Sequence, residues 1–374
     1  MRIKTIWESE TVEVNRRLVP FSYWPTKKSG SRSTVQSRIF ASNPFNIMDD
    51  AVGRISESSR RVEAKAYLQQ AREFYAASEI GSTDNTKPLL LYYSFMNVVK
   101  ALILQRDAFN TLADTHHGLT LRFNTVDADP ANAQLGAKIS TGTGSNIKVN
   151  LYDELLKVLD PTTVKNRDYE IYLSDLFPQI LLGHRLWRDS TGESERFINV
   201  PDIQFRRDKD EGEIWIRMAL PRSEYIRLGH SQEKLLSLSS LDTEWERKQS
   251  EVKDDNIYIE PLHVAESSRP SEHVDQLVEP LRNVLWQSVT MTKPFRRHYL
   301  YLSVGERYPQ LCSIYAMFFY LGSLARYRPQ KLREYMTGNF GAFFSEFIEN
   351  QPTQWLYLMA SLYAKQEVSK ASVV

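Results

Sequence analysis

Two adjacent histidines are the first residues whose types suggest chemistry. His116 and His117 precede Gly118 in a polar stretch. A histidine can serve as a general base or a metal ligand, because its unperturbed pKa lies near neutrality. No second histidine or carboxylate stands at a recognised zinc spacing, and neither HExxH nor CxxC occurs. Gly118 also suits the left-handed backbone that closes a helix, so the sequence favours a structural role for His117 over a catalytic one.

Two carboxylates flank a predicted hairpin. Asp202 follows Pro201, and Glu213 opens the next expected strand. Some nucleases hold a divalent metal between two such acids, and a lysine two residues farther on activates water. Trp215 occupies that lysine's position, and Asp202 is more simply explained as a turn residue. Asp202 and Glu213 are therefore candidate catalytic residues beside His117, although the structural interpretation is favoured.

A basic and aromatic cluster near residue 297 is a candidate binding site. It consists of Arg296, Arg297 and His298, with Lys293 before it and Tyr299 and Tyr301 after it. Arginine contacts to phosphate combined with aromatic stacking suit nucleic acid. A second group of arginines lies between residues 206 and 227. Ordinary solvated strand faces would carry the same residue types, and that interpretation is favoured.

Two expected helices carry further candidate binding residues. Arg326 ends an apolar helix, where a cation can bond the last carbonyls and interact favourably with the helix dipole. Ser94, Asn97 and Lys100 lie three residues apart and form one polar stripe on an earlier apolar helix. A buried lysine needs a partner or a shifted pKa, so the stripe could line a polar cavity. In the alternative, which is slightly favoured, Lys100 extends into solvent near the helix end.

Familiar nucleotide, nuclease and metal motifs are incomplete in this sequence. Thr141–Ser145 is glycine-rich but lacks the Gly-Lys-Ser/Thr ending of a phosphate loop, so a hairpin turn is favoured. Helical nucleases of the HEPN class place four to six residues between an arginine and a histidine, and no histidine here fits. The single cysteine, Cys312, excludes an internal disulfide and a multi-cysteine metal site. We expect no metal site and no cofactor.

Composition indicates a folded globular protein without a membrane span. The 374 residues are 42% hydrophobic, and the formal net charge is +1, so no global field attracts nucleic acid or an anionic membrane. The longest apolar stretches, 88–104 and 311–325, fall short of the roughly 20 residues that span a bilayer. Both are expected to be buried core helices, and a cytoplasmic location follows.

Hydrophobic periodicity predicts helices at both ends of the chain and strands between them. Residues 1–57 look irregular, and 230–255 read as a surface helix or linker. The predicted helices are 59–80, 88–105, 151–159, 169–187, 309–326, 330–336, 340–349 and 353–366. The predicted strands are 137–140, 147–150, 203–207, 213–220, 256–263, 286–292 and 299–304. In 213–220 the apolar residues alternate, which is typical of a strand with one core face.

Four stretches of this sequence are similar to one protein family. They are Ala66–Tyr75, Lys87–Asn97, His117–Leu119 and Leu324–Pro329. They resemble the YaaC family of bacterial proteins, and the similarity spans roughly residues 60–335. The resemblance implies neither an established activity nor agreed catalytic residues. Orphan bacterial proteins of this kind are sometimes parts of phage-defence loci, which is an association rather than a physical argument.

We expect an α+β fold with a predominantly helical core and a small antiparallel sheet in the middle. Residues 1–57 would be an irregular N-terminal segment and 58–190 a helical part with a short hairpin. Residues 191–304 would be a β-rich insertion. The C-terminal helices, 305–374, would pack on 58–106, since two apolar helical blocks each need partners.

The leading functional hypothesis is an intracellular binding or assembly component, acting through protein partners, self-association or nucleic acid and belonging to a bacterial phage-defence system. It depends on the lack of a complete catalytic motif and on the family resemblance. The alternative is a nuclease or other hydrolase whose site assembles from distant residues, among them His117, Asp202, Glu213 and Arg297.

Overall fold

A computed structural model of the chain describes most of its 374 residues. The described residues are 9–29, 32–80, 85–112, 114–142, 148–161, 165–208, 210, 212–229, 231–241, 245–248, 256–261, 265–266, 270–289 and 298–371. The chain divides into two compact units that interleave along the sequence. The strand-rich unit comprises Met1–Phe40, Ser194–Gly305 and Lys365–Val374, and the helical unit comprises Ala41–Glu193 and Glu306–Ala364.

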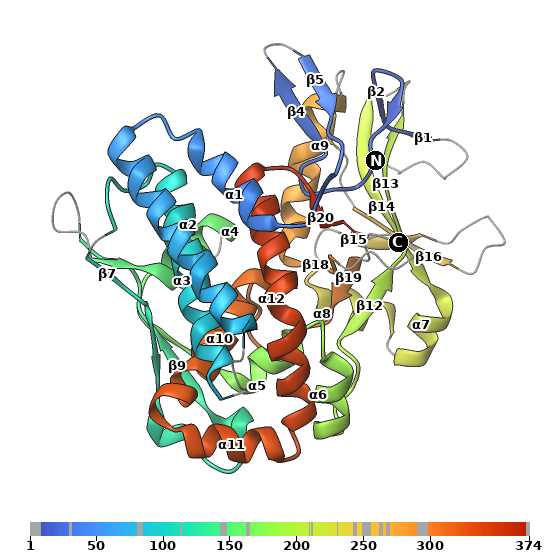
Figure 1. Ribbon diagram of the computed structural model, residues 1–374. Helices are drawn as coiled ribbons and strands as arrows, with labels where there is room; N and C mark the ends of the chain where they lie inside the picture. Colours follow the sequence, from blue (N-terminus) through green and yellow to red (C-terminus); the bar gives the residue numbers. More distant parts are fainter. Residues whose placement is uncertain are drawn as a thin grey trace. The chain divides into compact units, whose positions relative to one another are not determined.

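The helical unit is built on long helices from both ends of its sequence. Helix α2 (Ser58–Glu79) lies beside α3 (Lys87–Gln105), and α3 packs on α10 (Gln310–Tyr327) (Figure 1). The sequence predicted all three helices to within a few residues. Helix α1 (Pro44–Gly53) contacts both α2 and α12 (Gly341–Ala364). Early and late segments therefore share one interior.

Stacked aromatic rings fill that interior. Phe95 of α3 stacks on Trp355 of α12 with ring centroids 4.0 Å apart, and it meets Phe318 of α10 edge-on at 4.9 Å. Phe318 in turn lies 4.5 Å from Phe347. All four side chains are fully buried. Burial of such large rings contributes most of the energy that holds the early and late helices together.

Helix α3 is long and apolar enough to cross a membrane, by length and composition only. In the structure, 67% of that apolar window is buried inside the protein. A helix that is apolar nearly all round must be covered on most of its surface, and protein neighbours provide that cover here. Helix α3 is therefore a core helix of the helical unit.

Helix α12 corrects one expectation. The sequence predicted separate helices at 340–349 and 353–366, on either side of Pro352. The structure has one continuous helix, Gly341–Ala364, with Pro352 inside it. Phe347 and Ile348 before the proline and Trp355 after it are all fully buried. Packing of both halves against the same core outweighs the local cost of the proline.

Short strands and helices complete the helical unit and correct two further predictions. Tyr169–Tyr172, expected to be helical, forms strand β11, whose alternating apolar residues pair with β9 (Gln134–Ala137). Strand β10 (Val149–Asn150) pairs in parallel with β7 (Thr115–His116) rather than with residues 137–140, although one antiparallel bridge between Thr141 and Lys148 closes the expected hairpin turn. Residues 143–147 of the expected hairpin turn lie outside the described residues.

The remaining elements of this unit are short. They are β8 (Leu119–Leu121), α4 (Leu151–Leu159), α5 (Leu173–Leu176), α6 (His184–Thr191), α11 (Pro329–Thr337) and the 3-10 turns Phe123–Thr125, Pro130–Asn132 and Phe177–Gln179.

The strand-rich unit centres on an antiparallel sheet in the order β1-β13-β14-β16-β15. Strands β13 (Asp202–Asp208) and β14 (Glu213–Pro221) form the predicted hairpin. Strand β16 (Asn256–Pro261) lies beside β14, β15 (Trp245–Lys248) and β1 (Glu10–Thr11) form the edges, and β17 (Ala265–Glu266) also pairs with β14. The coarse prediction of a mixed α+β protein is correct, but the strands fall into several small sheets rather than one.

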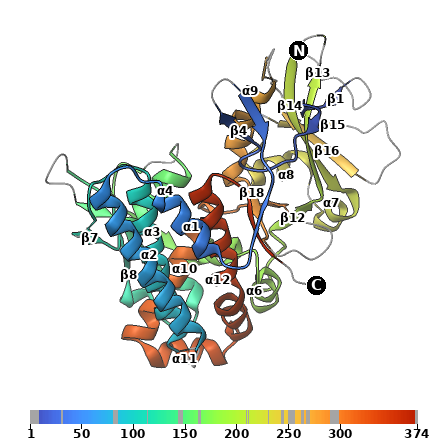
Figure 2. The same ribbon diagram turned by 45° about the horizontal axis from the view of Figure 1, so that its top comes forward.

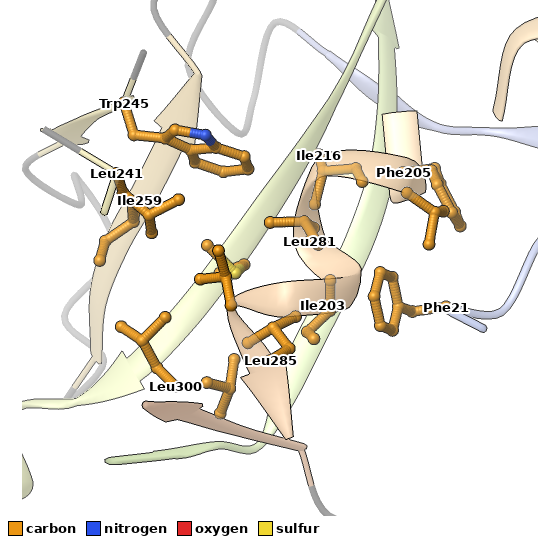
Figure 3. Packing of buried hydrophobic residues seen from close by; sticks show 14 of the residues in the cluster. Phe21, Ile203, Phe205, Ile216, Leu241, Trp245, Ile259, Leu281, Leu285 and Leu300 are labelled. Carbon is orange, nitrogen blue, oxygen red and sulfur yellow. The ribbon is translucent and has the colours of Figure 1, made fainter. Parts of the chain in front are cut away.

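One face of this sheet packs on an apolar cluster. Figure 3 shows Phe21 beside Phe205, with their ring centroids 6.0 Å apart, and Leu281 and Leu285 packed near Ile203. These side chains are at most 9% exposed. Ile203 and Phe205 on β13, and Ile214, Ile216 and Met218 on β14, point into this cluster at every second position, as the pleat of a strand requires.

The opposite face of β14 is also buried, which corrects the expectation of a single core face. Trp215 is fully buried, and Arg217 forms an ion pair with Glu260 of β16 on the same side. The Trp215 indole N–H donates to Glu260 at 3.3 Å. The opposite charges of Arg217 and Glu260 compensate one another on this buried face, where water cannot solvate them.

A second three-stranded sheet and several helices cover the unit. The sheet has the order β12-β19-β18, from Phe197–Val200, His298–Tyr301 and Leu285–Gln287. Strands β18 and β19 pair with each other and lie where the sequence predicted strands, near 286 and 299. The helices are α7 (Arg222–Leu228), α8 (Gln232–Ser239), α9 (Pro270–Val278) and the 3-10 turn Glu279–Asn283.

The N-terminal segment is more regular than expected. It contributes β1, the hairpins β2–β3 (Glu13–Val14, Arg17–Leu18) and β4–β5 (Thr26–Ser29, Arg32–Val35), and β6 (Ile39–Ala41), which pairs with β20 (Val368–Lys370). Helix α9 lies beside the β4–β5 hairpin (Figure 2). The Thr26 hydroxyl donates to Asp275 of α9 at 2.9 Å, so a long-range contact orders this stretch.

Candidate functional site

Exposed rings and arginines gather where helix α10 ends. Tyr327, the last residue of α10, meets Phe123 edge-on with ring centroids 5.8 Å apart. The Arg326 guanidinium lies 4.9 Å from the Tyr327 ring centroid, and that of Arg328 lies 5.5 Å from the Phe123 centroid. Tyr327 is 55% exposed and Phe123 39%. We call these four residues the Arg326 surface.

The local sequence explains why these side chains reach the surface. Arg328 precedes Pro329, and a residue before proline is disfavoured in helical conformation. Arg328 takes φ −142° and ψ 55°, so α10 ends there and α11 begins at Pro329 in a new direction. The break leaves the side chains around it uncovered.

Both arginines of this surface keep their charge unneutralised. Among the described residues, neither Arg326 nor Arg328 forms an ion pair with a carboxylate. The neighbouring Arg122, by contrast, bonds Glu170 at 2.6 Å. An exposed guanidinium without an acidic partner is free to bind a phosphate, and the ring beneath it offers a stacking face.

Tyr93 of α3 holds Arg326 in place. The Arg326 guanidinium donates to the Tyr93 hydroxyl at 3.1 Å, and the Tyr93 ring stacks on Phe74 of α2 at 5.5 Å. The sequence predicted instead that Arg326 would cap the carbonyls of α10. Its place in the last helical turn still suits the dipole, but its hydrogen bond goes to the neighbouring helix.

His117 stands next to this surface with its ring partly covered. Its Nδ1 lies 2.6 Å from the hydroxyl of Tyr92. Burial lowers the pKa of His117, and the positive charges of Lys100, Arg326 and His116 lower it further. The imidazole is therefore neutral at pH 7, and it can act as a base or accept a proton when an anion arrives.

The turn after His117 needs glycine. Gly118 has φ +79°, and a Cβ there would lie 3.1 Å from both the Asn150 Cβ and the Tyr152 backbone nitrogen. The sequence correctly predicted positive φ at Gly118, although the residue follows strand β7 and does not close a helix. Close packing against the start of α4 thus fixes the direction of His117.

The polar stripe on α3 divides into two parts. Ser94 donates to the Ala71 carbonyl at 2.8 Å, and Asn97 donates to the Gln70 side chain at 2.8 Å. Both residues are buried, and their hydrogen bonds join α3 to α2. Structural pairing therefore accounts for the polar groups of Ser94 and Asn97.

Lys100, the third member of the stripe, is different. Its ammonium lies 4.8 Å from the centre of the Tyr67 ring. Burial lowers the pKa of Lys100, and Glu63 partly offsets that effect. The Glu63 carboxylate already accepts hydrogen bonds from Tyr67 at 3.1 Å and from the Leu112 amide at 2.9 Å. Lys100 consequently keeps a charge that no described carboxylate pairs directly.

The paired-carboxylate hypothesis is wrong. In the register of the hairpin, Asp202 lies opposite Ala219, and Glu213 lies opposite Asp208. Asp202 and Glu213 therefore sit at opposite ends, about 20 Å apart at the rise of a β-strand. One metal ion cannot bind both. Among the described residues, no group of three histidines, cysteines or carboxylates could hold a metal.

The cluster predicted near residue 297 is only partly described. Arg296 and Arg297 lie outside the described residues. His298 is 8% exposed, its Nε2 lies 3.2 Å from the Gln287 side-chain nitrogen, and its ring meets Phe21 edge-on at 5.0 Å. Its described contacts are those of a core histidine.

Sequence reasoning named Arg326, Lys100 and His117 separately but missed the aromatic half of the Arg326 surface. Phe123 lies in an irregular stretch, and its partner Tyr327 is distant in sequence. The available signal was Tyr327 itself, an aromatic residue between two arginines beside a proline.

Comparison with known proteins identifies the family. Among curated proteins, no match to this chain was found. A family model described as YaaC-like Protein matches residues 29–363, which is most of the chain. That range includes every residue of the Arg326 surface as well as Lys100 and His117. The chain therefore belongs to the YaaC-like protein family.

Proposed function

We propose that this protein is an intracellular, non-catalytic binding component that holds single-stranded nucleic acid on the Arg326 surface. One observation carries the proposal. Two exposed aromatic rings alternate with two exposed arginines, and no described carboxylate pairs with either arginine. Nucleic acid offers the matching groups, since phosphates bind arginine and bases stack on rings.

Single strands fit this surface better than duplexes. A ring can stack on a base only where the base is not already stacked within a helix. Phe123 and Tyr327 lie against one another and are both exposed, so each ring is accessible to an unpaired base. The balanced net charge of +1 also argues against a strongly electrostatic duplex binder.

Binding of a fluorescent single-stranded oligonucleotide, followed by anisotropy, tests this proposal. Tyr327→Ala should weaken binding about tenfold, because stacking contributes about 1–3 kcal/mol for each base. Replacing both arginines, Arg326→Gln with Arg328→Gln, should weaken binding and flatten its salt dependence by roughly one to two units of slope.

Arg54→Gln is the matched control. Arg54 is an exposed arginine of the helical unit, but it pairs with Asp50. Its replacement changes the net charge by the same amount as one arginine of the surface, and binding should stay unchanged. If Arg54→Gln lowered the affinity for the oligonucleotide as much as the Arg326 surface variants do, binding would depend only on the total charge of the protein. That result would refute the proposed site.

The alternative, a hydrolase, is favoured by one observation. His117 is neutral at neutral pH and stands near the cations Lys100 and Arg326, an arrangement that suits a general base beside a phosphate. Incubation of RNA and DNA with the protein and Mg²⁺ or Mn²⁺ separates the two proposals. Shortened strands that form with the wild-type protein but not with His117→Ala would favour the hydrolase over the binding proposal. Strands that stay intact would support the binding proposal.

A further inference from the structure

The two rings of the Arg326 surface stand nearly at right angles to one another. The planes of Tyr327 and Phe123 make an angle of 84°, and their centroids lie 5.8 Å apart. A base that stacks on a ring lies parallel to it, and consecutive bases that stack on one another are also parallel. Two bases that lie on these two rings therefore cannot stack on one another.

Each ring also has an arginine of its own. The Arg326 guanidinium lies 4.9 Å from the centroid of Tyr327, and the Arg328 guanidinium lies 5.5 Å from the centroid of Phe123. A nucleotide brings one base and one phosphate, and a ring with a nearby guanidinium offers a partner to each of them. The Arg326 surface therefore consists of two adjoining places of the same composition, each suited to one nucleotide.

Hydrogen bonds hold the segment that carries Phe123. The Thr125 hydroxyl accepts the backbone N–H of Gln134 at 2.9 Å. The hydroxyl of Tyr335, in α11, donates to the backbone carbonyl of Asp127 at 2.7 Å. The other ring of the pair belongs to the last turn of helix α10. Because both rings are attached to hydrogen-bonded backbone, the protein supplies their arrangement before a ligand binds.

We propose that the Arg326 surface binds two consecutive nucleotides with their bases unstacked from one another, one base on Tyr327 and the next on Phe123. This inference rests on the proposed function and names its ligand more closely. The ligand is a strand whose neighbouring bases are free to turn apart, as they are in loops and at flexible ends. A strand that keeps its bases in a continuous stack can use only one of the two rings.

A short oligonucleotide with two adjacent 2-aminopurines measures this geometry. In the free strand the two bases stack, and their coupling gives a circular dichroism signal at wavelengths where the protein does not absorb. Saturation with the wild-type protein should abolish most of this signal, because the two rings turn the bases apart. If anisotropy shows that the complex has formed and the full signal remains, the inference is overturned and single-strand binding stays intact.

Two variants assign the effect to the pair of rings. Phe123→Leu removes one ring at an exposed position, so the bound bases can stay stacked and the signal should persist in the complex. Arg328→Gln is the matched control, since it removes a charge but keeps both rings. It should weaken binding and still abolish the signal at saturation. A signal that the Phe123→Leu complex also loses would place the unstacking elsewhere and overturn the inference.

A series of 5′-phosphorylated thymidine nucleotides of increasing length tests the number of places, by competition with a fluorescent strand. Affinity should rise about tenfold from one nucleotide to two, because a second base stacks, and less than about threefold with the third. In Phe123→Leu the rise from one to two should be lost. A gain that continues evenly with each added nucleotide overturns the two-nucleotide site but not single-strand binding. Failure of every strand to bind, the fluorescent one included, overturns both.

Discussion

At the scale of single residues, the buried charge pair of the strand-rich unit shows how much one carboxylate can matter. Arg217 is 5% exposed and Glu260 is fully buried, and they lie on adjacent strands of one sheet. Glu260 also accepts the indole N–H of Trp215. Removing one partner of such a pair leaves a charge without compensation in a medium of low dielectric constant.

We predict that Glu260→Gln destabilises the protein by about 3 kcal/mol, because Arg217 would stay buried without its counter-charge. Glutamine matches glutamate in size, so packing around Trp215 should be retained. Chemical denaturation measures the change. Glu224→Gln, at an exposed pair with Arg227, should cost less than about 1 kcal/mol, and equal losses in the two variants would contradict this explanation.

The residues of the candidate site were predictable to different degrees. A cation at a helix end and a lysine on an apolar helix are visible in the sequence, so Arg326 and Lys100 could be named. The partnership of Phe123 with Tyr327 was not visible, because it depends on packing between segments about two hundred residues apart. Asp202 and Glu213 looked like partners only until the hairpin register was known.

At the scale of elements, the turn after β7 positions His117. Gly118 takes a left-handed conformation against α4, where a side chain would crowd Asn150. Gly118→Ala should therefore destabilise the protein by about 1–3 kcal/mol, from strain in the backbone and from the close contact.

Gly53→Ala is the control for that prediction. Gly53 ends helix α1, and a Cβ there would meet nothing within 4 Å. Alanine should leave stability unchanged or raise it by up to about 1 kcal/mol, because it restricts the unfolded chain. If the denaturation curves of Gly118→Ala and Gly53→Ala coincided, the backbone at position 118 would accept a side chain without strain. That result would contradict the prediction.

Elements with strong local periodicity were predicted well. Helices α2, α3, α4 and α10 lie within a few residues of their expected ranges, because an apolar stripe at helical spacing is a local signal. Strand β11 and the unbroken helix α12 were not predicted. In both cases contacts with distant segments override the local preference, namely pairing with β9 and burial around Pro352.

At the scale of the whole molecule, each of the two units is formed by segments that are separated in the sequence. The strand-rich unit takes segments from the beginning, the middle and the end of the sequence. Periodicity could suggest that the early and late helices share a core, and Phe95 against Trp355 shows the contact. Periodicity could not show that residues 9–29 and 32–40 belong with the middle strands, since their pairing with β13 and β20 is long-range.

The central claim is that bases of a single strand lie on the rings of the Arg326 surface. Photochemical cross-linking of an oligonucleotide carrying 5-bromouracil, followed by mass spectrometry of the peptides, tests it most directly. We predict adducts on the peptides that contain Phe123 and Tyr327, with their loss in Arg326→Gln combined with Arg328→Gln. Adducts confined to other peptides, or unaffected by those substitutions, would contradict the claim.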